Sequence, residues 1–160
     1  MAAYLIVDVD DLLDHFRSRG IAVDLQELAV GLRGSAALAA GLVSADRLKA
    51  IAVGSWLKYR EQGNVEREYV FKAAGYDIFD MPHRESLADT LIIHYFSYDP
   101  DPVDELILAT TSRDLLPVIR RVKVTRNARV RMWGSVDVLQ GTEFAEEVVF
   151  QPLESLLGIQ

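Results

Sequence analysis

Short apolar runs alternate along the chain with segments whose apolar residues recur every three or four positions. A run of four to eight apolar residues is typical of a buried strand, whereas the longer spacing is typical of an amphipathic helix. The runs that predict strands are residues 3–9, 49–55, 76–79, 105–109, 128–133 and 148–150. The segments that predict helices or helical turns are residues 11–19, 65–74, 86–98, 115–123 and 153–157, with a further helix after Asp24.

Glycines and capping residues mark several of these boundaries. Gly20 and Gly75 follow predicted helices, in the position where glycine commonly ends a helix. Asp24 with Glu27 three residues later forms the pattern of a capping box, which predicts a helix start. Residues 34–43 are rich in Ala, Gly and Leu, so they either continue that helix or form a small-residue loop.

The alternation of strands and helices predicts βαβ units. We therefore expect a three-layer α/β/α sandwich with a mostly parallel central sheet, a Rossmann-like architecture. At 160 residues, half of them apolar and with no evident linker, residues 1–160 are expected to form a single domain. Ligands of such sheets bind where the strands end, at the carboxyl edge.

The composition indicates in which compartment the protein works and which classes of partner it binds. The sequence has no cysteine, which fits a reducing compartment, and no apolar run long enough to cross a bilayer, so we expect a cytoplasmic protein without a membrane partner. A net charge of −7 argues against general coating of nucleic acid. Even so, residues 113–131 hold seven of the seventeen basic residues and one acid, a composition that suits either a polyanion site or a solvated helix face.

Three places along the chain supply acids at or near predicted strand ends. Asp8, with Asp10 and Asp11 close behind, ends the first strand, Asp89 lies in the helix before the 105–109 strand, and Asp114 follows that strand. Carboxylates that converge repel one another unless a cation neutralises them, and oxygen ligands suit Mg²⁺ or Mn²⁺. Three of these acids also have a purely structural interpretation: Asp114 as a helix cap or first-turn acid, Asp11 as an N-cap, and Asp89 as a solvated helix residue.

These motifs resemble the NYN branch of the PIN-like nuclease superfamily. That family has an apolar strand ending in Asp-x-x-Asn, an Asp at the start of a mid-chain helix, and a strand leading into Ser-Gly-Asp-x-Asp-Phe. The corresponding segments here are Asp8-Val9-Asp10-Asp11, Ser86-Leu87-Ala88-Asp89-Thr90 and Thr110-Thr111-Ser112-Arg113-Asp114-Leu115. The resemblance extends over almost the whole chain in order and spacing.

The resemblance implies a metal-dependent ribonuclease, a hydrolase that binds RNA and uses Mg²⁺ or Mn²⁺. The catalytic residues implied are Asp8, Asp89 and Asp114, and the metal ligands are these three with Asp11. Thr111 or Ser112 would position a water or a phosphate oxygen. Basic residues would hold the flanking backbone of the RNA: Arg113, Arg120, Arg121 and Lys123, within the segment that ends at Arg131.

Four departures from the family pattern bear on this expectation. Asp11 stands where the family has Asn, and Ser86 where a Lys often precedes the helix Asp. Thr111 replaces a Gly, and Ser112 replaces an Asp, which removes one carboxylate. Asp10 is a candidate substitute for that missing acid.

Two other functions stay open at the sequence level. Loss of the carboxylate at Ser112 would suit a catalytically reduced PIN-like domain that binds RNA or a protein partner, with Trp56, Tyr59 and Trp133 as candidate contacts. The alternation around Trp133 favours a core position for it. The strand followed by Asp8-x-Asp10 also resembles a haloacid-dehalogenase-like phosphohydrolase, although a later acidic pair is missing. The oligomeric state, including a homodimer, is left open.

Overall fold

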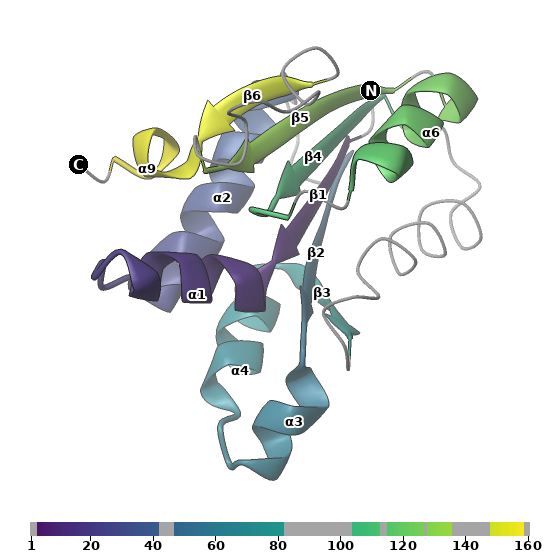
Figure 1. Ribbon diagram of the computed structural model, residues 1–160. Helices are drawn as coiled ribbons and strands as arrows, with labels where there is room; N and C mark the ends of the chain where they lie inside the picture. Colours follow the sequence, from purple (N-terminus) through teal and green to yellow (C-terminus); the bar gives the residue numbers. More distant parts are fainter. Residues whose placement is uncertain are drawn as a thin grey trace.

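Strands and helices alternate in the computed structural model, which describes residues 3–41, 47–81, 104–112, 115–126, 128–135 and 148–158 (Figure 1). The strands are β1 (Ala3–Asp8), β2 (Leu48–Gly54), β3 (Tyr76–Asp80), β4 (Glu105–Ala109), β5 (Arg129–Gly134) and β6 (Val149–Pro152). The helices are α1 (Val9–Ser18), α2 (Leu25–Ala39), α3 (Trp56–Glu61), α4 (Glu66–Ala73), α6 (Leu116–Arg126) and α9 (Leu153–Leu156).

All six strands form one parallel sheet in the order β3-β2-β1-β4-β5-β6. The chain starts at β1, builds outward to β3, and then crosses back to place β4 on the other side of β1. The strand order therefore reverses between β1 and β4, and this reversal is the switch point at which open α/β sheets form a crevice. The residues that follow β1 and β4 are thus brought together at one edge.

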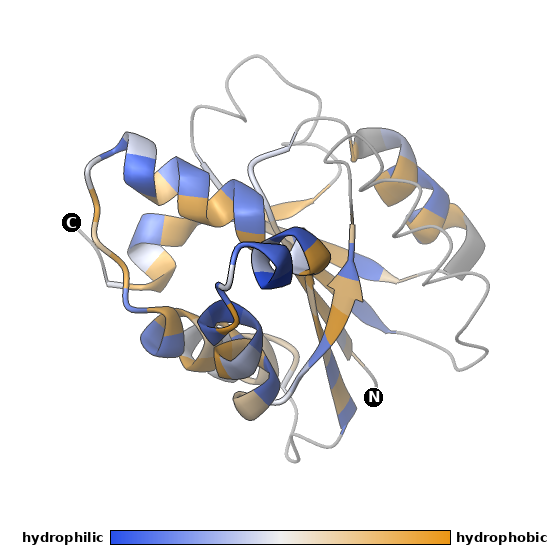
Figure 2. Ribbon diagram, turned by 90° about the horizontal axis from the view of Figure 1, so that it is seen from below, coloured by the Kyte–Doolittle hydropathy of each residue, from blue (hydrophilic) through white to orange (hydrophobic). Residues whose placement is uncertain are grey.

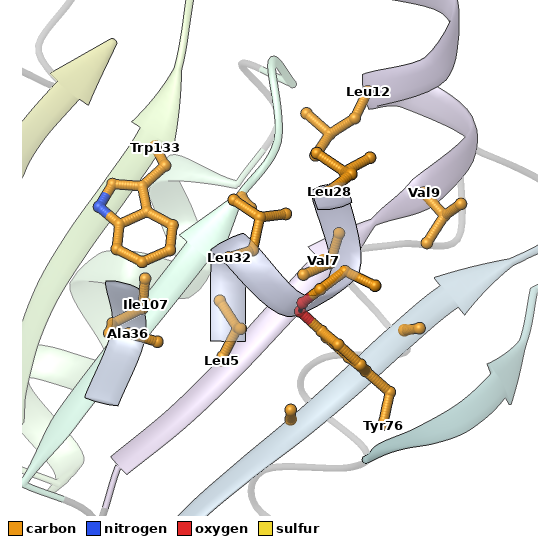
Figure 3. Close-up of a cluster of buried hydrophobic side chains, with 14 of the residues drawn as sticks. Leu5, Val7, Val9, Leu12, Leu28, Leu32, Ala36, Tyr76, Ile107 and Trp133 are labelled. Carbon is orange, nitrogen blue, oxygen red and sulfur yellow. Dashed lines mark hydrogen bonds between the residues drawn. The ribbon is translucent and has the colours of Figure 1, made fainter. Parts of the chain in front are cut away.

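Apolar side chains cover both faces of the sheet. On one face, α1, α2, α3, α4 and α9 contribute to a core that includes Leu5, Val7, Leu12, Leu32 and Trp133 (Figure 3). On the other face, α6 packs its buried residues against β1, β4 and β5, as the two views of the ribbon also indicate (Figures 1 and 2). The expected α/β/α architecture is confirmed.

The local predictions agree with most of the element boundaries. Asp24 caps α2, with its Oδ1 accepting the backbone N–H of Glu27 at 2.9 Å, and Gly20 and Gly75 follow helices with positive φ angles of 68° and 94°. Residues 34–39 continue α2 rather than forming a loop.

One helix of the structure was not predicted, and one predicted helix cannot be compared with it. Helix α3 has no counterpart among the predicted elements, and the predicted helix at residues 86–98 lies outside the described residues. Within the described part of the chain, every helix is too short or too polar to span a membrane.

Candidate functional site

Asp8 lies at the switch point, buried at the end of the central strand. Every residue of β1 is buried, and Asp8 is only 2% exposed. Helix α1 begins at the next residue, yet the Asp8 side chain does not cap it. Instead, Asp8 Oδ2 accepts a hydrogen bond from Thr110 Oγ1, 3.1 Å away, in the segment that follows β4. A buried carboxylate therefore joins the carboxyl ends of the two strands that flank the crevice.

Asp11, in the first turn of α1, reaches the same segment. Its Oδ2 accepts the backbone N–H of Thr111 at 2.6 Å, and Thr111 Oγ1 lies 2.7 Å from Oδ1 and 2.8 Å from Oδ2. Thr110 Oγ1 is 3.4 Å from Asp11 Oδ2 and also accepts the backbone N–H of Ser112 at 3.1 Å. The Thr110 hydroxyl thus lies between two buried carboxylates, since Asp11 is 6% exposed.

The neighbouring strand β5 fixes this segment from the other side. The Thr110 N–H donates to the Trp133 carbonyl at 3.0 Å. A Cβ atom at Gly134 would lie 2.7 Å from the Thr110 carbonyl oxygen, closer than carbon and oxygen atoms normally approach. Only glycine therefore allows β5 to lie this near Thr110. No pattern in the sequence marks Gly134. The hydroxyl residues directly after the 105–109 strand were a usable signal, which suited the phosphohydrolase alternative, but Thr110 was not among the residues expected to form the nuclease site.

Asp10 points to a different set of partners. Its Oδ2 accepts the N–H and the hydroxyl of Ser55 at 3.0 and 2.9 Å, and its Oδ1 accepts the Tyr59 hydroxyl. Burial, followed by the hydrogen bond to Asp10, raises the pKa of Tyr59 to about 12. Asp10 therefore anchors the start of α3, and this arrangement does not favour it as the substitute acid of a metal site or as the acid–base group of a phosphohydrolase.

Several predicted roles can now be compared with the structure. Asp8, Asp11, Thr111 and Ser112 are brought together, whereas Asp89, Arg113 and Asp114 lie outside the described residues. Among the residues that the structure does describe, no three His, Cys, Asp or Glu side chains converge as a metal site would require. The interpretation of Asp11 as an N-cap is wrong, because α1 begins at Val9 and Asp8 holds that position.

The aromatic candidates divide between core and surface. Trp56 is 1% exposed, so its predicted role as a surface contact is wrong; its Nε1–H donates to the carbonyls of Ala52 and Phe79, each 3.1 Å away. Trp133 is fully buried, which confirms its core position. Tyr59 is partly buried against Trp56 and Asp10.

The described residues of the basic segment lie in two separate places. Arg120 and Arg121 are exposed on α6, and Lys123 is partly buried there. By contrast, Arg131 and Arg129 of β5 form ion pairs with the buried Glu105 at the start of β4. This cluster occupies the amino ends of the strands, the edge opposite the switch point, so Arg129 and Arg131 do not extend an RNA-binding face around the candidate site.

Comparisons with known proteins identify a fold and no function. No family model matches the chain, and no curated protein matches it. A crystal structure of a protein of unknown function from Vibrio parahaemolyticus is similar, with a TM-score of 0.64, 14% sequence identity, and coverage of 97% of this chain and 94% of that one. At this identity the similarity supports the shared architecture alone.

Proposed function

We propose that this protein is a metal-dependent ribonuclease with its reaction centre at Asp8. The observation that carries the proposal is the Asp8 carboxylate, 2% exposed, at the end of the central strand and at the switch point of the sheet. Burial of a charged carboxylate is costly unless the site compensates for it, so such a residue at a ligand-binding edge suggests a chemical role. The resemblance to NYN nucleases supports the choice of reaction.

The oxygen-rich surroundings of Asp8 suit a hard divalent cation. Asp8 and Asp11 approach one hydroxyl within 3.1 and 3.4 Å, and positive charge would offset their repulsion. We assign Asp8, together with Asp89 and Asp114, to holding Mg²⁺ or Mn²⁺. When bound, such an ion lowers the pKa of water and stabilises the charge of a phosphodiester transition state.

The chain's own polar groups would orient the substrate around that centre. Thr110, Thr111 and Ser112 follow β4 at the crevice, and their hydroxyl groups would position a water or a phosphate oxygen there, with the Thr110 hydroxyl next to Asp8. The exposed Arg120 and Arg121 on α6 supply positive charge for flanking phosphates. We further propose a cytoplasmic location, which the absence of cysteine from the sequence favours.

Cleavage of a labelled, mixed-sequence single-stranded RNA tests this proposal. Purified protein is assayed in Mn²⁺, in Mg²⁺ and in EDTA, with Asp8→Asn as the test variant. Asp14→Asn is the matched control, because Asp14 lies on the outer side of α1 with a side chain 55% exposed. We expect RNA cleavage to require both the metal ion and Asp8, and we expect Asp14→Asn to cleave RNA as the unmodified protein does. Activity in EDTA or full activity in Asp8→Asn would contradict the mechanism.

A second candidate function is RNA or protein binding without catalysis. The observation that favours it is the pairing of Asp11 with Thr111, because both carboxylate oxygens accept hydrogen bonds within the protein and so offer fewer lone pairs to a metal ion. Ser112 also stands where the family has a carboxylate. Calorimetric titration with Mn²⁺ separates the two functions: uptake abolished by Asp8→Asn supports the nuclease, whereas no uptake together with RNA retention at low salt supports the binding module.

A further inference from the structure

The contacts of Asp11 are those of an anchor for the segment after β4. Thr111 presents two donors, its N–H and its hydroxyl, and both face the Asp11 carboxylate at distances of 2.6 to 2.8 Å. Charge-assisted hydrogen bonds of this length are strong and directional. Because Asp11 is 6% exposed, little water competes for its oxygens.

Anchoring Thr111 also determines where the preceding residue lies. The backbone of Thr110 is held on its other side by Trp133 and by the close approach of Gly134. With Thr111 bound to Asp11, the Thr110 hydroxyl is placed 3.1 Å from Asp8 Oδ2. The segment therefore crosses the switch point under restraint from α1 on one side and from β5 on the other.

We propose that Asp11 is a positioning residue, which acts through Thr111 to hold the Thr110 hydroxyl on Asp8, and that it is not a metal ligand. This inference rests on the proposed function for its catalytic consequence, and it reassigns the role that the family resemblance gave to Asp11. Its geometric content, the anchoring of residues 110–112 by Asp11, does not depend on the reaction.

The chemistry of an amide at position 11 separates the two roles. An Asn side chain can accept the Thr111 N–H through Oδ1 and donate to Thr111 Oγ1 through Nδ2, so it can reproduce the anchor. The same amide lacks the negative charge that a metal ligand supplies. If Asp11 positions the segment, Asp11→Asn should thus keep the cleavage activity that Asp11→Ala loses. If Asp11 binds the metal, both variants should lose that activity.

The first measurement is kcat for RNA cleavage at saturating Mn²⁺ in Asp11→Ala, Asp11→Asn and Thr111→Val. We expect Asp11→Ala and Thr111→Val to lower kcat by about tenfold or more, the scale on which supporting groups act around metal sites, with Asp11→Asn recovering activity to within about threefold of the unmodified protein. Equal losses in Asp11→Asn and Asp11→Ala would overturn the positioning role. Thr111→Val preserves side-chain shape, so the test stands even where Asp11→Ala fails to fold.

The second measurement is amide hydrogen exchange across residues 105–112, which needs no enzymatic activity. Exchange at residues 110–112 should rise about tenfold or more in Asp11→Ala and stay within about threefold in Asp11→Asn, with Asp14→Asn as the control. If the unmodified protein cleaves no RNA but exchange follows this pattern, the nuclease function fails while the anchor is supported. Unchanged exchange in Asp11→Ala overturns the anchor whatever the cleavage assay shows.

Discussion

The close approach of β5 to Thr110 makes Gly134 a sensitive position for both stability and the site. In Gly134→Ala the new Cβ would lie 2.7 Å from the Thr110 carbonyl oxygen, whereas ordinary van der Waals contacts begin near 3.4 Å. The difference is about 0.7 Å, and the obstacle is the backbone of Thr110, whose N–H is bound to the Trp133 carbonyl and which cannot rotate away as a side chain could. The Thr110 segment or β5 must therefore shift.

The expected cost follows from that forced shift. Overpacking a close-packed region by one methyl group typically costs about 1–3 kcal/mol. For a chain of this size each kcal/mol lowers Tm by about 2–4 °C, so the expected decrease is about 2–12 °C. Because the displaced residue also carries the hydroxyl on Asp8, we expect RNA cleavage to fall in the same variant.

Gly34→Ala is the matched control for this measurement. Gly34 lies within α2, is exposed, and would bring its new Cβ within 4 Å of nothing. Replacing such a helical glycine by alanine should raise stability by about 0.5–1 kcal/mol. Scanning calorimetry of both variants should thus give Tm changes of opposite sign; a Gly134→Ala protein as stable as the unmodified one would refute the close approach and the restraint it places on Thr110.

Three further predictions concern groups away from Thr110. Tyr59→Phe removes the hydroxyl that donates to Asp10 and should cost about 1–2 kcal/mol in urea unfolding, while ultraviolet titration of the unmodified protein should show one tyrosine ionising near pH 12. The hydrogen bond from Arg60 lowers the pKa of Glu68 to about 2 from an ordinary 4.5. The contribution of the Glu68 carboxylate to stability is therefore complete above pH 4.5 and is lost as the pH falls toward 2. In Glu68→Gln, the free energy of unfolding should vary less with pH over that window. Glu105→Gln removes a fully buried charge that is paired with two arginines of β5. It should lower the free energy of unfolding in urea by about 2–3 kcal/mol. An unchanged urea midpoint would contradict this prediction.

The sequence was sufficient to predict the strands because buried parallel strands are nearly continuous apolar runs, which residues 106–109 show clearly. It also identified Asp8 as a strand-end acid, since Asp8 is the first charged residue after such a run. It could not reveal α3. Ser55 holds the N-cap position, but its side chain donates to Asp10 and does not cap the helix. The N–H groups at the start of α3 are instead bound by Asp10 and Asp80, which lie 45 and 23 residues away from their partners.

The partners of Asp10 and Asp11 depend on strand order, which no local pattern records. Consecutive residues of a helix point about 100° apart, so neighbouring acids in the first turn of α1 face in different directions. The ends of β2 and β4 lie on opposite sides of β1, and the partners of Asp10 follow β2 whereas those of Asp11 follow β4. If β2 and β4 exchanged places in the sheet, Asp10 and Asp11 would have different partners although the sequence of the three acids would be the same.

This division means that the acids of the motif are not interchangeable. Asp10 stabilises α3, Asp11 holds the segment after β4, and Asp8 lies between them at the centre of the sheet. Under the proposed nuclease function, Asp10 is therefore not a substitute for the carboxylate that NYN nucleases have at the position of Ser112, because its oxygens face the opposite side of β1. The nuclease function that we propose is therefore centred on Asp8, and under that proposal a substitute for the carboxylate at the position of Ser112 would come from the β4 side of the switch point.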